Sequence, residues 1–423
     1  MIKLVREPIR CVIIGIGGYG RNHLHDLYTL AEEGKVILVA ATIKDDNELP
    51  EEQEHLKQLG CQLFQDPSKM LTTLKGQVDL CFINTSISSH YQFIREAIQA
   101  DCHVFVEKPM VTVIQDALEL RDLSRATGKW IAVGFQHMYE PNLHQLKQFL
   151  CDGGIGKIEK ATGTGKWPRS LSYYNRNPWA GTVRHQDVWA LDSPVSNALA
   201  HYIQLTLFLT GDQTSSVASP TSLCAETYRA MPIESFDTGF ISIETLEGID
   251  IFFAVTHACA QHHPPRVQIH GDRGMLDWVV SDYRKDGSCT VHLHSGEQIH
   301  FPLPKHEEYR KKLIPSIIEH ARDPGNYVCS VDSVIPHILC INGIYESSQV
   351  SPFPEDIIER RIDDGEEFRF LSGIEKLVDR TAKQMQFPSE LGVPWSSVGK
   401  RVHLGEYVHF PQRQTSPLIA ASV

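Results

Sequence analysis

Three glycines near the start of the chain have the types and spacing of a phosphate-binding turn. Gly15, Gly17 and Gly20 form the pattern G-x-G-x-x-G, in which the first glycine permits a sharp turn and the second lets a diphosphate approach the backbone. The third lets a helix pack closely on the preceding strand, and the free N–H groups at the start of that helix attract phosphates. A glycine-rich turn without a ligand is the alternative. The expected dinucleotide contacts in this turn are Gly15, Ile16, Gly17, Gly18, Tyr19 and Gly20.

A lysine farther along the chain has the chemistry to stabilise a developing negative charge. Lys108 lies between Glu107 and Pro109, directly after an expected strand at residues 104–106. Pro109 biases Lys108 toward an extended backbone, and an ammonium group there could donate to a carbinol oxygen and stabilise a developing alkoxide. An exposed surface lysine is the alternative. Glu107 would contact the dinucleotide or form an ion pair with a neighbouring residue.

A strand, helix and strand pattern in the first 140 residues supplies the elements that must position these groups. Strands and helices alternate, and such alternation requires a parallel sheet with both faces covered. Helical patterns end at Gly34 and Gly128, where a glycine stops the periodicity. The expected strands lie at residues 11–14, 36–43, 78–83, 104–106 and 130–135, with helices behind the glycine turn, near 90–100 and near 115–126.

Polar residues follow several of these strands. Ligands of parallel sheets bind at the carboxyl ends of the strands, so residues at these ends should converge on one crevice. The further cofactor contacts expected there are Asn84, Thr85, His90, Glu107, Lys108, Pro109 and Gln136.

The end of the second strand leaves the choice between NAD and NADP open. An acid usually binds the ribose hydroxyls at this position, but Ile43 stands there in this sequence. Lys44 follows, and it is either a contact to a 2′-phosphate or a solvated loop charge. We therefore expect NAD or NADP as cofactor.

The pattern changes beyond about residue 150. Clustered strands, a hairpin turn at Glu247-Gly248, and helices at 196–210, 307–321 and 332–348 indicate an α+β domain with an open, mainly antiparallel sheet. The predicted fold is thus α/β, with an N-terminal Rossmann dinucleotide-binding domain followed by that α+β domain. The expected boundaries are 1–140 for the Rossmann domain, 141–385 for the substrate and oligomerisation domain, and 386–423 for an irregular C-terminal tail.

Aromatic and basic residues are concentrated between residues 166 and 181. Flat aromatic faces stack on the C–H surface of sugars, and arginine or asparagine side chains hydrogen-bond to hydroxyls. An amphipathic loop or a subunit contact would have a similar composition. The weaker candidates for substrate contact are Trp167, Arg169, Tyr174, Arg176 and Trp179.

Together these landmarks resemble the glucose–fructose oxidoreductase/inositol dehydrogenase (Gfo/Idh/MocA) family over roughly residues 8–350. The glycine turn and the sequence Glu107-Lys108-Pro109 carry the resemblance, with Gly134-Phe135 and the turn at Gly271–Gly274 as further points. The resemblance implies a nicotinamide cofactor and hydride transfer to or from a sugar, a polyol or a related carbinol.

The resemblance also selects two residues of the second domain. The expected helix with Asn197 and His201 falls where the family usually has an Asp-x-x-x-His pair, so His201 is the candidate base and Asn197 its neighbour one turn earlier. Lys108, His201 and Asn197 are therefore the predicted catalytic residues. The sequence departs from the family pattern at Asn197, at Met138, where an arginine is common, and at Ile43.

Composition excludes several other classes of protein. The 423 residues are enough for two domains, and the net charge of −12 disfavours nucleic acid and anionic membranes as partners. Ten scattered cysteines show no disulfide or zinc spacing. His257, Cys259, His262 and His263 lack an evident fourth ligand, so no metal site is predicted. No segment resembles a signal peptide or a membrane span, and we expect a cytoplasmic protein.

Two other functions use the same scaffold. A bound NAD could assist the elimination or hydrolysis of a glycoside without net redox change, and a nucleotide-binding regulator would need no catalysis. The expected partner is a small-molecule sugar or polyol substrate, and an open sheet in the second domain favours a homodimer or homotetramer.

Overall fold

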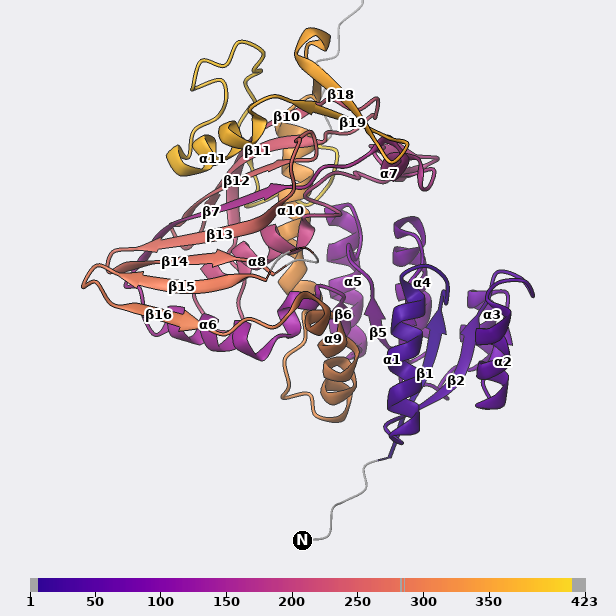
Figure 1. Cartoon of the computed structure of the whole chain (residues 1–423). Coiled ribbons are helices and arrows are strands. Elements are labelled where there is room, and N and C mark those ends of the chain that lie inside the picture. Colours follow the sequence, from indigo (N-terminus) through magenta and orange to yellow (C-terminus); the bar gives the residue numbers. More distant parts are fainter. Residues whose placement is uncertain (1–6, 282–283, 285, 413–423) are drawn as a thin grey trace, which may run out of the picture.

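The computed structural model describes residues 7–281, 284 and 286–412, which form two large sheets and two small two-stranded sheets, with helices around them (Figure 1). The first sheet has six parallel strands in the order β3-β2-β1-β4-β5-β6. Its strands are β1 (Ile9–Ile14), β2 (Val36–Thr42), β3 (Gln62–Phe64), β4 (Leu80–Ile83), β5 (His103–Val106) and β6 (Ile131–Val133). The helices between them are α1 (Gly20–Glu32), α2 (Pro50–Gln58), α3 (Pro67–Thr73), α4 (Ile87–Gln99) and α5 (Ile114–Thr127).

The strand order explains where a ligand can bind to this sheet. β1 pairs with β2 on one side and with β4 on the other, so the chain reverses its direction of travel across the sheet at β1. A crevice forms at the carboxyl ends of strands at such a point. β4 is buried along its whole length, as expected for a strand covered on both faces by helices. The predicted Rossmann architecture is confirmed.

The second sheet has ten strands and is mainly antiparallel, with β7 and β12 as a parallel pair inside it. The chain reaches it through a short 3-10 helix, η1 (Gln136–Tyr139), and α6 (Pro141–Cys151). Its strands are β7 (Ile158–Lys166), β10 (Pro220–Arg229), β11 (Thr238–Thr245), β12 (Asp250–Thr256), β13 (His263–Gly271), β14 (Gly274–Val279), β15 (Ser288–Leu293), β16 (Gln298–Phe301), β17 (Ser351–Pro352) and β20 (Val402–His403).

Most of the remaining elements pack around this second sheet, whereas α9 (His306–Arg322) packs against α1 and β1 of the first domain. The elements around the second sheet are α7 (Leu171–Asn175), the pair β8 (Arg184–His185) and β9 (Val188–Trp189), α8 (Ala200–Thr210), α10 (Val331–Ser347), the 3-10 helix η2 (Glu355–Ile357), the hairpin β18 (Ile358–Asp363) and β19 (Glu366–Leu371), and α11 (Ile374–Gln384). The predicted open α+β domain and the hairpin at Glu247-Gly248, which joins β11 to β12, are confirmed.

Alternate residues of β12 enter two different cores. Phe253 and Val255 belong to the large core that contains α8 and α10, whereas Phe252 and Ala254 belong to a smaller cluster with Val378 of α11. Side chains of a strand alternate between faces, so β12 is apolar on both sides and α11 covers the outer face at this point. In Figure 1, α8 and α10 lie between the sheet and the Rossmann domain.

The helix expected at residues 196–210 is shorter than predicted. α8 begins at Ala200, so Asn197 lies in the preceding turn and does not share a helical face with His201. The hydroxyl of Ser196 donates to the carbonyl of Leu191, and it accepts the backbone N–H of Ser193. These local side-chain bonds favour a turn over a helix.

The described part of the tail, residues 386–412, packs on the body of the protein. Trp395 makes edge contacts with Tyr228 and Phe353, at centroid distances of 4.9 and 4.8 Å. β20 pairs with β10, and Phe410 exchanges two backbone hydrogen bonds with the side chain of Gln115 on α5. The division of the chain near residues 140 and 385 stays a prediction. Among the described residues, no helix combines the length and apolar character that a membrane span requires.

Candidate active site

A cavity of about 1400 Å³ extends from the glycine turn of the first domain to the aromatic and basic segment of the second. The predicted residues that line it are Gly15, Gly17, Gly18, Tyr19, Lys44, Asn84, Thr85, His90, Glu107, Lys108, Pro109, Trp167, Arg169, Arg176, Trp179 and Asn197. The cavity thus brings together residues from strand ends of the Rossmann sheet and from the loops that follow β7 and β9.

The glycine turn fits a diphosphate for steric reasons. Gly15 has a φ of +86°, and a Cβ there would lie 2.9 Å from the carbonyl oxygen of Asn84. A Cβ on Gly20 would lie 2.3 Å from the carbonyl oxygen of Gly15. No side chain caps the start of α1, and the N–H groups of Gly20, Arg21 and Asn22 donate to carbonyls of the turn itself, so an anion would be bound by the N–H groups of the turn and by the positive end of the helix dipole. The turn therefore has the shape and the donors that a nicotinamide dinucleotide needs.

A glutamate that the sequence analysis missed lies beside this turn. A Cβ on Gly17 would lie 2.7 Å from Oε1 of Glu48, and Oε2 of Glu48 accepts the backbone N–H of Lys44 at 2.6 Å. Ile43, the position where an acid was expected, is buried. Glu48 lies beyond the end of β2 in a loop, so the usual spacing provides no signal for it, yet it lines the cavity.

Lys108 reaches across the cavity to the second domain. Its Nζ donates to the backbone carbonyl of Asn197 at 2.8 Å and to Oδ1 of the same residue at 3.2 Å. Burial lowers the pKa of Lys108 from its usual value, while Glu107 and Asp192 act in the opposite direction. A lysine in this setting exchanges its proton closer to neutral pH than a surface lysine does.

Asn197 is itself held in place by a buried acid. Its Nδ2 donates to Oδ1 of Asp192 at 2.8 Å, and Oδ2 of Asp192 accepts the backbone N–H of Gly181 at 2.7 Å. Burial raises the pKa of Asp192, and the Gly181 bond opposes that rise. The amide of Asn197 is thus oriented with its oxygen toward Lys108 and its nitrogen toward Asp192.

Glu107 and His90 support the loop of Lys108 from behind. Oε1 of Glu107 lies 2.7 Å from Nε2 of buried His23, and Oε2 accepts the backbone N–H of Lys108 at 3.0 Å. The two ring nitrogens of His90 lie 3.0 Å from the carbonyl oxygen of Pro109 and 3.1 Å from that of Thr85. Glu107 therefore contacts a neighbouring residue, and its expected contact with the dinucleotide stays a prediction.

Five predicted residues do not line the cavity. The ring of His201 packs against Phe135 and His137, with centroids 5.6 and 5.3 Å away. Tyr174 is buried, and its hydroxyl pairs with Nδ1 of His257 at 3.0 Å. Ile16, Gly20 and Gln136 also lie outside the lining, although Gln136 accepts a hydrogen bond from the hydroxyl of Tyr19 at 3.2 Å.

Tyr173 lines the cavity where Tyr174 was expected. The two residues are neighbours on α7, and the composition of the segment does not distinguish which one faces the ligand. As for metal ions, the parts of the chain that the structure describes contain no group of three or more His, Cys, Asp or Glu side chains arranged to hold one.

Both domains of the chain match models of known protein families. Residues 9–135 match the model described as "Oxidoreductase family, NAD-binding Rossmann fold", and residues 143–277 match the "GFO/IDH/MocA C-terminal domain". The two matched ranges meet near the 3-10 helix that links the two sheets.

Several curated proteins are similar in sequence. An inositol 2-dehydrogenase/D-chiro-inositol 3-dehydrogenase of Halalkalibacterium halodurans is 24% identical over 293 residues, which cover 67% of this chain and 76% of that protein. A D-glucoside 3-dehydrogenase of Escherichia coli is 28% identical over 161 residues, or 38% of this chain and 44% of that protein.

Solved structures share the fold. The WlbA dehydrogenase of Bordetella pertussis, in complex with NADH and UDP-GlcNAcA, superposes with a TM-score of 0.62 at 22% identity, over 80% of this chain and 95% of that one. The 3-ketoreductase KijD10 of Actinomadura kijaniata, in complex with NADP and TDP-benzene, gives a TM-score of 0.63 at 16% identity, over 82% and 100% of the two chains.

The contact between Lys108 and Asn197 generates a prediction about proton affinity. Asn197→Asp places a carboxylate where Oδ1 now accepts from Lys108, so the pKa of Lys108 should rise. An NMR titration of ¹³C-labelled lysine side chains measures the shift, with Lys108→Met used to assign the signal. Asn47→Asp, an exposed residue of the loop after β2, is the matched control and should leave the titration unchanged. An unchanged pKa of Lys108 in the Asn197→Asp variant would contradict the contact.

Proposed function

Because the chain belongs to the Gfo/Idh/MocA family of NAD-binding oxidoreductases, we propose that it transfers a hydride between the nicotinamide and a CH–OH carbon of a sugar, a polyol or a related carbinol. The observation that carries this proposal is the position of Lys108 in the same cavity as the glycine turn. The names of the similar proteins, which include inositol and glucoside dehydrogenases, support the substrate class.

Lys108 is the proposed acid–base group. When bound, the nicotinamide supplies the hydride acceptor for oxidation and the hydride donor for reduction. In oxidation, the neutral amine of Lys108 accepts the hydroxyl proton, and in reduction its ammonium returns a proton to the carbonyl oxygen. Two N–H bonds of Lys108 point at the two oxygens of Asn197, which leaves its lone pair or third N–H for the carbinol oxygen.

The role of His201 as a base stays a prediction. Its ring packs beside Phe135 and outside the cavity lining, so the proposal assigns the contact with the carbinol oxygen to Lys108. Asn197 is a positioning residue in this scheme, because it orients the amine of Lys108 and is itself oriented by Asp192.

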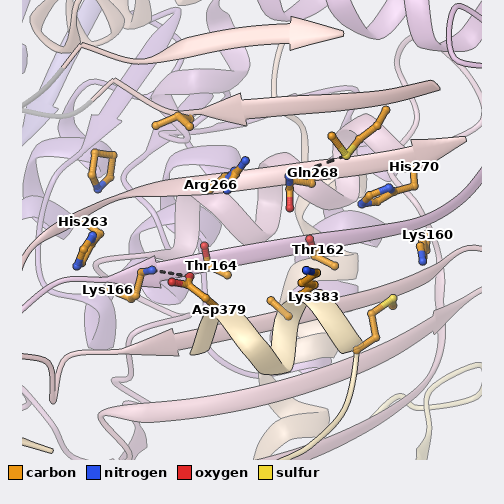
Figure 2. Close-up of a pocket in the computed structure, with 15 residues that line it drawn as sticks. Lys160, Thr162, Thr164, Lys166, His263, Arg266, Gln268, His270, Asp379 and Lys383 are labelled. Atoms are coloured by element: carbon orange, nitrogen blue, oxygen red, sulfur yellow. Dashed lines mark hydrogen bonds and ion pairs between the residues drawn. The ribbon is translucent and has the colours of Figure 1, made fainter. Parts of the chain in front are cut away.

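We also propose a homodimer or homotetramer that associates through the outer face of the second sheet. α11 covers this face over β12 and part of β7, but a hollow of about 600 Å³ remains over β7 and β13 (Figure 2). Asp379 and Asp277 pair with Lys166 and Arg266 at its edges, which moderates its positive charge. A second copy would cover the remaining strands. The cytoplasmic location likewise stays a prediction.

The central test replaces Lys108. Lys108→Met keeps the approximate length of the side chain but removes the amine, so turnover of an accepted sugar or polyol should fall about a hundredfold to ten-thousandfold. Nicotinamide absorbance at a series of pH values measures it. In the unaltered enzyme, oxidation should accelerate with rising pH through the lowered pKa of Lys108, because the reaction needs the neutral amine.

The control for this test is binding of the cofactor, which should survive Lys108→Met because the glycine turn is intact. Normal turnover in the variant would refute the assignment of Lys108. Net accumulation of reduced nicotinamide would separate this function from a redox-neutral elimination.

Glu48 predicts a preference for NAD. Its carboxylate beside Gly17 can accept ribose hydroxyls, and it would repel a 2′-phosphate. Glu48→Gln should therefore reduce the ratio of NADP to NAD dissociation constants about tenfold, as measured by fluorescence titration. Glu51→Gln, an exposed residue of α2, is the control. A native preference for NADP would contradict this role of Glu48.

The assembly proposal predicts a mass of two or four chains in sedimentation experiments at micromolar concentration. Gln268→Arg adds a charge to the floor of the hollow and should shift the population toward single chains. Gln58→Arg, exposed on α2, should not. A monomeric native protein would refute the proposal.

A further inference from the structure

Two arginines of the second domain line the cavity and are held by aromatic rings. The guanidinium of Arg169 lies 4.6 Å from the ring centroid of Tyr173 and 5.4 Å from that of Trp167. The guanidinium of Arg176 lies 3.8 Å from the ring centroid of Tyr173 and 5.4 Å from that of Trp179. Such stacking fixes the plane of a guanidinium but does not neutralise its charge.

Neither guanidinium has an ion pair with a carboxylate of the described residues. Nε of Arg169 is buried without a hydrogen-bond partner, and Arg176 donates from Nη1 to the backbone carbonyl of Tyr173. The nearby carboxylate of Asp192 interacts electrostatically with Arg176. The two oxygens of Asp192, however, already accept hydrogen bonds from Gly181 and Asn197. Arg169 also hydrogen-bonds to the hydroxyl of Tyr173. Because a guanidinium carries five N–H bonds, further terminal N–H groups of both arginines remain for a ligand in the cavity that they line.

The buried histidine packed directly behind this pair adds no further charge. His257 is buried against Tyr174, and its pKa lies well below the usual value because of burial and of the two arginines. The imidazole is accordingly neutral. Together with Lys108, this end of the cavity carries more positive than negative charge, which is unusual in a chain with a net charge of −12.

From this arrangement we infer that the substrate carries an anionic group, a carboxylate or a phosphate, which Arg169 and Arg176 bind while Lys108 contacts the reacting carbinol. The inference rests on the proposed function, since it names the class of sugar that the same site accepts. A planar guanidinium presents paired N–H donors that match the oxygens of a carboxylate or a phosphate.

A neutral polyol fits this end of the cavity less well. Its hydroxyls can accept from the arginines, but they leave the positive charge uncompensated and partly removed from water. The diphosphate of the cofactor is not the expected partner, because the N–H groups of the glycine turn and the positive end of the helix dipole of α1 are placed for it.

The test compares matched ligands on the NAD-loaded protein by isothermal titration calorimetry. Methyl β-D-glucuronide and methyl β-D-glucoside differ only in the carboxylate, and glucose 6-phosphate against glucose separates phosphate from carboxylate as the anion. The favoured acidic ligand should bind at least about tenfold more tightly than its neutral match. Arg169→Met and Arg176→Met should each bring that ratio close to one.

Arg184→Met is the matched control, because Arg184 also stacks on a ring, that of Trp189, but does not line the cavity. The affinity for NAD reports whether each variant is folded. Arg169→Lys and Arg176→Lys keep the positive charge but remove the paired N–H donors of the guanidinium. Equal affinities for the acidic and neutral ligands, or a preference that persists in both methionine variants, would overturn the inference.

The titration also separates this inference from the proposed function. If the turnover of neutral sugars depends on Lys108 and the acidic ligands bind no more tightly than the neutral ones, the anion site is wrong and the oxidoreductase assignment stands. If the acids bind through the arginines but no ligand is oxidised or reduced, the anion site stands and the assigned reaction is wrong.

Discussion

The contact on which the rest of the site depends is the bridge from Nζ of Lys108 to the two oxygens of Asn197. It joins the end of β5 in one domain to the turn before α8 in the other. An ammonium removed from water is costly unless it is hydrogen-bonded, so the bridge both stabilises Lys108 and fixes the position of Asn197. His90 and Glu107 hold the lysine loop from one side, and Asp192 holds the asparagine from the other.

The amide at residue 197 gives this bridge its particular chemistry. A carboxylate at this position would pair with the ammonium and hold it protonated, whereas the amide and its backbone carbonyl provide two acceptors without a charge. The carboxylate lies behind the amide, at Asp192, where burial and the N–H of Gly181 determine its proton affinity. The site thus separates the group that orients the amine from the group that carries the negative charge.

Much of the first domain could be predicted from the sequence, since each strand end there carries a local signal. The turn of Gly15, the polar residue Asn84 and the triplet around Lys108 follow buried strands, and the parallel sheet brings them together. Two features of the site, one in each domain, carry no such local signal. Glu48 reaches Gly17 through a loop whose path no periodicity encodes, and Asn197 sits in a turn that serine hydroxyls favour over the helix that its apolar neighbours suggest.

The fold class of the second domain could be predicted from the sequence, but the helix that packs on the outer face of its sheet could not. β12 is a continuous apolar run because both of its faces are buried, yet the partner of its outer face, α11, lies more than a hundred residues later. The aromatic and basic segment was recognisable by composition alone. Tyr173 and not Tyr174 lines the cavity because the hydroxyl of Tyr174 pairs with buried His257, a contact between distant parts of the chain.

The anchoring of the C-terminal segment has a consequence for how ligands come and go. Gln115 of α5 exchanges two hydrogen bonds with the backbone of Phe410, and buried Asn342 of α10 bonds to the backbone of Thr112 and Ile114 at the start of the same helix. These bonds connect the two domains, so a hinge motion between the domains would have to break two buried and two partly buried hydrogen bonds. Ligand exchange that leaves these bonds intact takes place at the present width of the cavity, and residence times then reflect the contacts that the ligands make.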